Sequence, residues 1–230
     1  MDKRFLFLKR PFDVGLSAFG ILLSSPLWLV FGSLIWLEDR GPVFYAQERE
    51  GKGGRVFKAY KFRSMIKDAE QDGTPVQAEK DDPRVTPLGR LLRATAMDEL
   101  PQLFNIFRGD MSFVGPRALR PAEVERGRAR LPRSQRQSAD TKENGDRSNT
   151  KPNSQKVVAL KEIPGYRERL KAKPGLTGLA QVYLPADAPR KDKFRYDVFY
   201  IKRQSFWLDL RLIFRSFWIS FRGKWEKEEK

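Results

Sequence analysis

The chain contains no cysteine and no histidine among its 230 residues. The lack of cysteine excludes disulfides, thiolate nucleophiles and zinc–thiolate centres, and the lack of histidine excludes Ser-His-Asp triads and histidine-ligated metals. The sequence also has neither a Rossmann glycine fingerprint nor a P-loop. Any catalysis must therefore depend on carboxylates, hydroxyl groups, lysine, arginine or tyrosine.

Acidic residues are few relative to basic ones. The chain carries 45 Lys and Arg against 29 Asp and Glu, which gives a formal charge of +16. This balance indicates a polyanionic neighbour, which could be nucleic acid, an anionic membrane surface or a phosphorylated substrate. The length suits one domain with a hydrophobic core together with a modest membrane element.

Charged residues are absent from Val14 to Leu37, a run long enough to cross a bilayer, which needs about 20 residues. Basic residues precede the run, as in a signal peptide, but the run is too long and no small-residue cleavage site follows it. Because the chain is basic on both sides of the run, the positive-inside rule does not favour a simple span.

A proline interrupts this apolar run at Ser25-Pro26. Pro26 has no N–H and clashes with the carbonyl of Leu22, while serine hydroxyls can satisfy the backbone groups that are freed. We expect a sharp break there, in a re-entrant helix that returns to the side of the membrane from which it entered. The alternative is a spanning helix that Pro26 only kinks.

Residues 41–230 are expected to form one cytoplasmic catalytic domain after the basic N-terminus and membrane helix of residues 1–40. Two segments rich in β-branched and aromatic residues, Val43–Gln47 and Arg55–Phe62, flank glycines and predict a small β-hairpin. Pro87–Phe107 shows helical spacing with one interruption. The predicted fold class is α+β and mainly helical.

Two segments in the second half differ in character. Residues 132–155 are polar and lack aromatic residues, so we expect a disordered insertion, or alternatively a tether for a partner. Near the C-terminus an apolar stripe recurs at helical spacing opposite Asp209, Arg211 and Arg215, which predicts either a core helix or an amphipathic helix in the membrane interface. The stripe consists of Phe206, Trp207, Leu210, Ile213, Phe214, Phe217, Trp218 and Phe221.

The adjacent acids Asp98 and Glu99 stand at the start of a predicted helix, with Pro101 in its first turn. Acids at this position usually complement the helix dipole. Here arginines lie close in sequence, and guanidinium groups suit phosphate oxygens. A carboxylate can attack phosphorus or hold Mg²⁺, so this pattern predicts a metal-assisted phosphoryl site. The arginines are Arg84, Arg90, Arg93, Arg108, Arg117 and Arg120.

Five blocks in fixed order carry a resemblance to a known family. They cover nearly the whole chain apart from the polar insertion, and together they resemble the bacterial sugar transferases, the monotopic phosphoglycosyl transferases. The blocks are Lys61–Met65, Asp98–Asn105, Gly109–Arg117, Lys173–Val182 and Asp197–Tyr200.

The resemblance implies an enzyme that transfers a sugar 1-phosphate from a UDP-sugar to undecaprenyl phosphate and releases UMP. It implies a covalent aspartyl-phosphosugar intermediate, Mg²⁺ as cofactor, and a place at the cytoplasmic face of the bacterial inner membrane. The product would start a cell-surface glycan such as exopolysaccharide, capsule or lipopolysaccharide O-antigen. Expected partners are the donor, the lipid acceptor and the membrane, then a second copy or other glycan-assembly proteins, and no nucleic acid.

Roles carry over by position. Asp98 resembles the nucleophile and a Mg²⁺ ligand, and Glu99 its acidic partner. A Ser-Pro break like Ser25-Pro26 is also a family feature. The chain departs from the usual pattern after Arg117 and after Val182, which leaves the donor sugar open. The residues expected to bind substrate are Lys61, Arg63, Arg93 and Arg117.

Two other functions compete with this interpretation. The net charge alone would suit a membrane-anchored module that binds nucleic acid or anionic lipid, and such a module would tolerate Asp98→Asn. A scaffold that has lost catalysis is the third reading, and the intact acidic pair argues against it.

Overall fold

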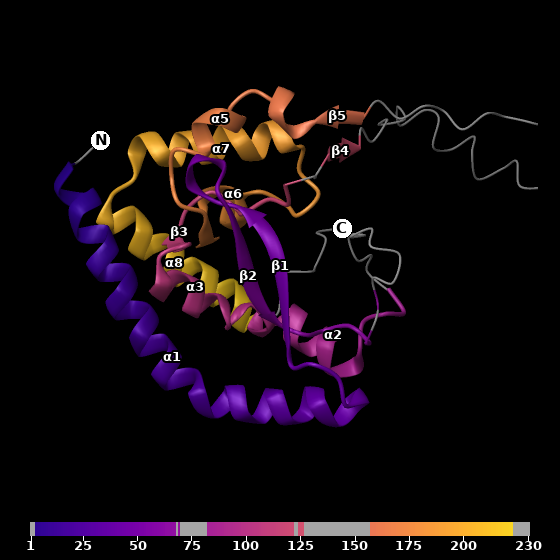
Figure 1. Ribbon diagram of the computed structural model, residues 1–230. Helices are drawn as coiled ribbons and strands as arrows, with labels where there is room; N and C mark the ends of the chain where they lie inside the picture. Colours follow the sequence, from indigo (N-terminus) through magenta and orange to yellow (C-terminus); the bar gives the residue numbers. More distant parts are fainter. Residues whose placement is uncertain (1–2, 68, 70–81, 122–123, 127–156, 223–230) are drawn as a thin grey trace, which may run out of the picture.

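The computed structural model describes residues 3–67, 69, 82–121, 124–126 and 157–222 (Figure 1). The predicted insertion at 132–155 lies outside these residues. Strand β4 (Val124–Arg126) pairs antiparallel with β5 (Val157–Ala159), so the chain leaves and re-enters the described part at neighbouring strands.

Helix α1 (Lys3–Asp39) has 37 residues and would be about 55 Å long if straight, well beyond the roughly 30 Å hydrocarbon layer. Figure 1 shows that α1 changes direction sharply about half-way along. The Ser25 hydroxyl donates to the Leu22 carbonyl at 2.8 Å, the acceptor that Pro26 leaves without an N–H, and Ser24 donates to Gly20 at 2.7 Å. The expected satisfaction of backbone groups around Pro26 is confirmed.

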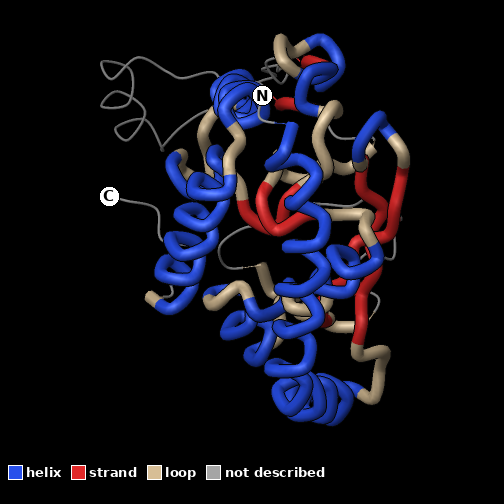
Figure 2. The backbone as a smooth tube through the Cα atoms, turned by 90° about the vertical axis from the view of Figure 1, so that its left-hand side faces the viewer, coloured by secondary structure: helices blue, strands red, loops and turns tan. Residues whose placement is uncertain are grey.

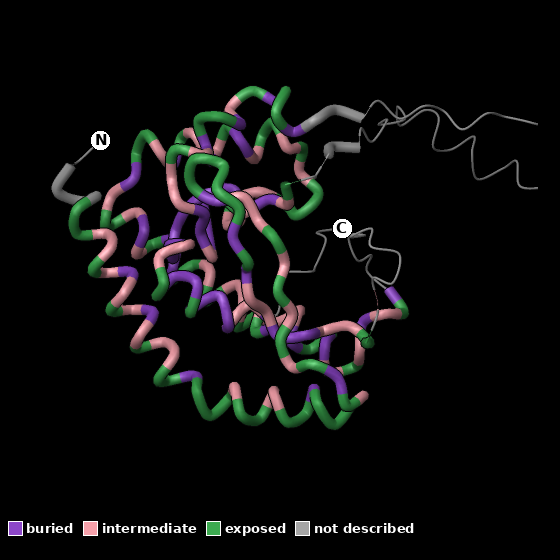
Figure 3. The backbone as a smooth tube through the Cα atoms, in the orientation of Figure 1, coloured by how far each residue is buried: buried purple, intermediate pink, exposed green. Residues whose placement is uncertain are grey.

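The inner face of α1 packs on the domain while its outer face stays exposed (Figure 3). Within the part of the chain described, Phe7–Asp39 is the helical stretch long and apolar enough to cross a membrane. Leu16 and Ile21 join the main core, whereas Trp28 and Ile35 pack against Phe62. Both limbs of the helix therefore contact the same body.

The predicted hairpin is confirmed: β1 (Phe44–Glu50) pairs antiparallel with β2 (Val56–Phe62) through seven residue pairs. The turn η1 (Lys52–Gly54) contains two glycines at positive φ, 70° and 79°, which side chains rarely tolerate. Along the other edge of β2, the buried Asn105 amide donates to the Lys58 carbonyl at 2.8 Å and accepts from the Tyr60 N–H at 3.0 Å.

The predicted interruption between 87 and 107 separates α2 (Pro87–Ala94) from α3 (Gln102–Arg108). Ala96 has a left-handed backbone (φ 57°) that turns the chain. Asp98 and Glu99 were expected at the start of the following helix. Instead they lie in a separate 3₁₀ turn, η2 (Met97–Glu99), which precedes α3. Pro101 caps α3, because a proline needs no partner for the missing N–H.

A short parallel pairing lies behind the hairpin: β3 (Ser112–Val114) runs beside β6 (Gly175–Thr177). The backbones approach closely, since a Cβ at Gly175 would lie 2.1 Å from the Gly115 nitrogen. Only glycine fits there, and this pairing was not predicted from the sequence.

Five further elements complete the described part, and α8 packs against β3 and β6: η3 (Leu160–Glu162), α5 (Tyr166–Arg169), α6 (Leu179–Tyr183), α7 (Arg190–Arg203) and α8 (Phe206–Phe221). Figure 2 shows α8 beside the N-terminal half of α1, and Phe12 contacts Phe206 edge-to-face at 5.3 Å.

The apolar stripe of α8 joins the core only in part: Ile213 is buried in the main cluster beside Leu212, whereas most of the stripe is exposed. Trp207, Phe214 and Phe217 are exposed, and the helix also buries the charged residue Asp209. Burial of Asp209, which was expected only on the face opposite the stripe, was not predicted. Its carboxylate pairs with Lys9 of α1 and accepts from the Tyr200 hydroxyl at 2.7 Å, which compensates for its burial.

Candidate active site

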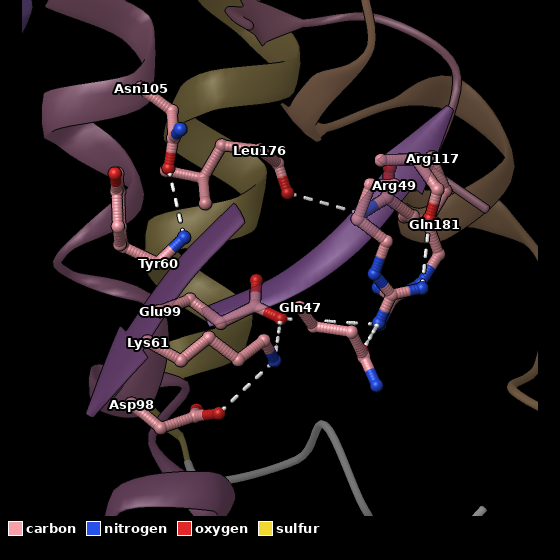
Figure 4. A network of polar contacts seen from close by, with 11 residues as sticks. Gln47, Arg49, Tyr60, Lys61, Asp98, Glu99, Asn105, Arg117, Leu176 and Gln181 are labelled. Carbon is pink, nitrogen blue, oxygen red and sulfur yellow. Dashed lines mark hydrogen bonds and ion pairs between the residues drawn. The ribbon is translucent and has the colours of Figure 1, made fainter. Parts of the chain in front are cut away.

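Lys61 and the acidic pair meet at the end of the hairpin (Figure 4). Strand β2 directs Lys61 toward η2, where its ammonium group lies 2.6 Å from a Glu99 oxygen and 3.2 Å from an Asp98 oxygen. The two acids share one cation because the 3₁₀ turn places their side chains on the same side. These three predicted residues form one cluster.

Burial sets the electrostatics of this cluster. The Asp98 side chain is 8% exposed and that of Glu99 is 18% exposed. Burial raises the pKa of Asp98, with Lys61 opposing and the Glu99 charge adding to the rise. Burial also acts to raise the pKa of Glu99, but the charges of Lys61 and Arg117 and the Lys61 hydrogen bond hold it at about 2. Glu99 is the firmly ionised member of the pair, and Asp98 the more basic one.

Two of the three predicted arginines lie near the acids. Arg117 is half-exposed and lies 4.0 Å from Glu99, so its guanidinium can face a ligand. Arg93, on α2, is close enough for its charge to lower the pKa of Asp98. Both positions suit phosphate binding.

The structure puts Arg63 in a different environment. It is buried, pairs with Asp39 at the end of α1, and donates to the Ile35 carbonyl at 3.4 Å. This arginine links the end of α1 to the hairpin. A role for Arg63 in substrate binding stays a prediction.

Several residues of the site were not identified from the sequence. Tyr45, Gln47 and Arg49 alternate along β1 and share the face of Lys61, whose partner across the hairpin is Tyr45. The charge of Arg49 also helps to lower the pKa of Glu99. The period-two pattern of polar residues could have revealed this row. Asn105, whose amide binds the backbone of β2, lies in one of the family blocks but had no predicted role.

A buried ion pair supports Arg117 from behind. Arg169 donates to an Asp197 oxygen at 3.1 Å and to the Arg117 carbonyl at 2.5 Å, and its guanidinium stacks on Phe194 at 4.7 Å. Asp197 belongs to one of the family blocks but had no predicted role. The pair fixes the backbone from which the Arg117 side chain extends.

The acidic pair has the oxygen ligands that Mg²⁺ would need. Among the described residues no group of three or more acidic or other metal-binding side chains could hold an ion alone. Mg²⁺ in enzymes commonly uses one or two carboxylates and completes its shell with water and substrate phosphates. Asp98, with Glu99 beside it, provides such a partial set.

The family model described as bacterial sugar transferase matches residues 4–143 and 145–223. The chain belongs to this family. A UDP-N-acetylgalactosamine-undecaprenyl-phosphate N-acetylgalactosaminephosphotransferase of Aeromonas hydrophila is 37% identical over 215 residues, 92% of this chain and 43% of its own. A UDP-glucose:undecaprenyl-phosphate glucose-1-phosphate transferase of Klebsiella pneumoniae is 36% identical over 221 residues, 94% of this chain and 40% of its own.

A third relative has almost the same length as the chain. The exopolysaccharide production protein PSS of Rhizobium leguminosarum bv. phaseoli is 35% identical over 214 residues, 91% of this chain and 92% of the relative. The chain thus spans less than half of the Aeromonas and Klebsiella proteins and nearly all of the Rhizobium protein. The matched family region includes the acidic pair and each of the basic residues around it.

Proposed function

We propose that this protein transfers a sugar 1-phosphate from a UDP-sugar to undecaprenyl phosphate and releases UMP, as the names of its relatives say of them. The observation that carries the proposal is the largely buried Lys61–Asp98–Glu99 cluster with the half-exposed Arg117 beside it. Carboxylates and cations together suit the transfer of a phosphoryl group between similar phosphates.

Asp98 is the proposed nucleophile. Its carboxylate attacks the phosphorus that bears the sugar, the bond from this phosphorus to the bridging oxygen breaks, and the electron pair leaves with UMP. A phosphate oxygen of the lipid then attacks the same phosphorus and releases Asp98. When bound, Mg²⁺ supplies positive charge for the phosphate oxygens at Asp98.

The environment favours Asp98 over Glu99 for the attack. Lys61 lies closer to Glu99, whose pKa is held low, whereas burial raises the pKa of Asp98. A more basic carboxylate is the stronger nucleophile. Glu99 keeps its charge and holds Lys61 in place, and Arg93 and Arg117 bind phosphate oxygens.

The same proposal gives α1 a re-entrant position at the cytoplasmic face of the bacterial inner membrane. Support comes from its two ends, because Lys9 pairs with Asp209 and Asp39 pairs with Arg63 on one body. A straight span would separate these ends by the thickness of the bilayer. The exposed aromatic residues of α8 suit the interface, and the product would start a cell-surface glycan.

The first test is UMP release with Mg²⁺, undecaprenyl phosphate and a panel of UDP-sugars. We expect release that requires lipid and Mg²⁺ and that falls by at least about 10³-fold in Asp98→Asn. Without lipid, label from the sugar should remain on the wild-type protein and not on Asp98→Asn. Turnover that survives Asp98→Asn would overturn the assignment of the nucleophile.

A further inference from the structure

A row of polar side chains on β1 faces the acidic pair. Tyr45, Gln47 and Arg49 lie on one face because successive residues of a strand alternate. Gln47 donates to the Tyr45 hydroxyl at 3.2 Å, and Arg49 donates to the Gln47 carbonyl oxygen. A second Arg49 nitrogen donates to the Ala118 carbonyl at 3.2 Å. The guanidinium is thus held against the segment that carries Arg117.

Gln47 and Arg49 line a pocket between β1, the Arg117 segment and α6 (Figure 4). Glu99 and Lys61 form one wall of this pocket, and Arg49, Arg117 and Gln181 contribute to the others. Three cations therefore surround the single carboxylate of Glu99 in the lining. Such an excess of positive charge, with two guanidinium forks, matches a group that carries several phosphate oxygens.

Gln181 adds a hydrogen-bond acceptor without a partner. Its side-chain nitrogen donates to the Leu176 carbonyl at 3.1 Å, and this contact fixes which way the amide points. Its oxygen is buried and has no hydrogen-bond partner in the described structure. A Cβ at position 178 would lie 2.9 Å from that oxygen, so Gly178 keeps the space beside it open. An unpaired buried acceptor is costly, and a ligand N–H or O–H would relieve that cost.

We propose that the side chains lining this pocket bind the diphosphate of the donor nucleotide, with Arg49 on the phosphate that leaves and the Gln181 carbonyl accepting from an N–H or O–H of the UDP-sugar. This inference rests on the proposed function and deepens it. When the bond from the sugar-bearing phosphorus to the bridging oxygen breaks, negative charge grows on the phosphate that leaves with UMP. Arg49 lies on the side of the pocket away from Asp98, where that phosphate would remain.

The test compares Arg49→Gln with Arg55→Gln in the full chain. Arg55 follows the turn of the same hairpin, is exposed, and loses the same charge. In Arg49→Gln we expect the KM for the UDP-sugar and the inhibition constant of UMP to rise on the order of tenfold or more, with the KM for undecaprenyl phosphate unchanged. In Arg49→Lys, which keeps the charge and loses the guanidinium fork, both constants should rise less. Arg55→Gln should match the wild type.

Equilibrium binding of UMP to purified protein separates this inference from the proposed function, because binding needs no turnover. If the protein has no transferase activity but its affinity for UMP depends on Arg49, nucleotide binding by this pocket would be supported and the proposed transferase function would be wrong. Transfer with equal UMP affinity in the Arg49 and Arg55 variants would overturn the pocket, as would a rise in the lipid KM alone. Thermal unfolding of each variant identifies loss of fold.

Gln181→Leu distinguishes the two sources of the hydrogen-bond donor. If the N–H or O–H that Gln181 accepts belongs to the nucleotide, this variant weakens UMP binding. If that group belongs to the sugar, only the KM for the UDP-sugar rises. Either result supports the assignment of Gln181, and unchanged values for both ligands would overturn it.

Discussion

Lys61 contacts both acids, and its unequal distances to them contribute to the difference between the two carboxylates. It lies closer to Glu99 than to Asp98, and the more weakly compensated Asp98 has the raised pKa. Sequence reasoning identified all three residues but not this asymmetry. The contact joins β2 to a turn 37 residues later, and no spacing rule predicts which oxygen an ammonium group will approach.

Replacement of Lys61 should shift the pH dependence of transfer. A nucleophilic carboxylate works only when ionised, so activity falls as the pH drops through the raised pKa of Asp98. Lys61 lowers that pKa, and Lys61→Met should therefore move the acid limb of kcat/KM to higher pH. Profiles of wild type and variant with the same donor measure the shift. The neighbouring exposed cation Lys58 provides the control, and a limb that moves equally in Lys58→Met would contradict the assignment.

Support of Arg117 by the Arg169–Asp197 pair gives a second prediction for single residues. Arg169→Met leaves the Asp197 carboxylate buried without its partner, which should cost about 3–5 kcal/mol of folding free energy. Adding Asp197→Leu should restore stability but not the hydrogen bond to the Arg117 carbonyl. We expect the double variant to unfold near the wild-type temperature while its donor KM stays raised. Full recovery of the KM would show that the pair acts on stability alone.

At the scale of elements, the sequence predicted those features that depend only on residues close together in the chain. The hairpin follows from β-branched residues around glycines, and the Ser25 bond to Leu22 follows from the chemistry of Pro26. The β3–β6 pairing was missed because three-residue strands separated by about 60 residues leave no periodic signal. The burial of Asp209 on α8 was missed because its partner, Lys9, lies at the other end of the chain.

The re-entrant path of α1 can be tested by single cysteines, because the natural sequence contains none. Phe7 is 79% exposed before the apolar run, and Lys67 is exposed after it. An impermeant thiol reagent should label Phe7→Cys and Lys67→Cys from the cytoplasmic side of oriented vesicles. Labelling from opposite sides would establish a span. Pro26→Ala, added to the Phe7→Cys variant, restores the missing N–H and allows a straight helix. It should therefore raise periplasmic labelling of Phe7→Cys.

Across the whole molecule, apolar surface and positive charge occur together. Exposed residues of α1, Met97 beside the proposed nucleophile and the aromatic stripe of α8 form the apolar part, while the chain as a whole carries a formal charge of +16. A phosphate at the end of a long hydrocarbon chain would meet both. Membrane attachment and access of the lipid acceptor to Asp98 thus become one requirement.

The stripe on α8 provides the test of this requirement. Phe214 and Phe217 are each 67% exposed, so changing both to serine removes little packing and should leave thermal unfolding nearly unchanged. Each aromatic ring that leaves the interface should cost on the order of 1 kcal/mol or more of membrane affinity. We expect weaker binding to anionic vesicles and a higher KM for undecaprenyl phosphate, with the KM for the UDP-sugar unchanged. Phe199→Ser, at an exposed aromatic of α7, is the matched control. Equal vesicle binding by the double variant and this control would mean that α8 does not lie in the interface, and α1 alone would then hold the enzyme at the membrane.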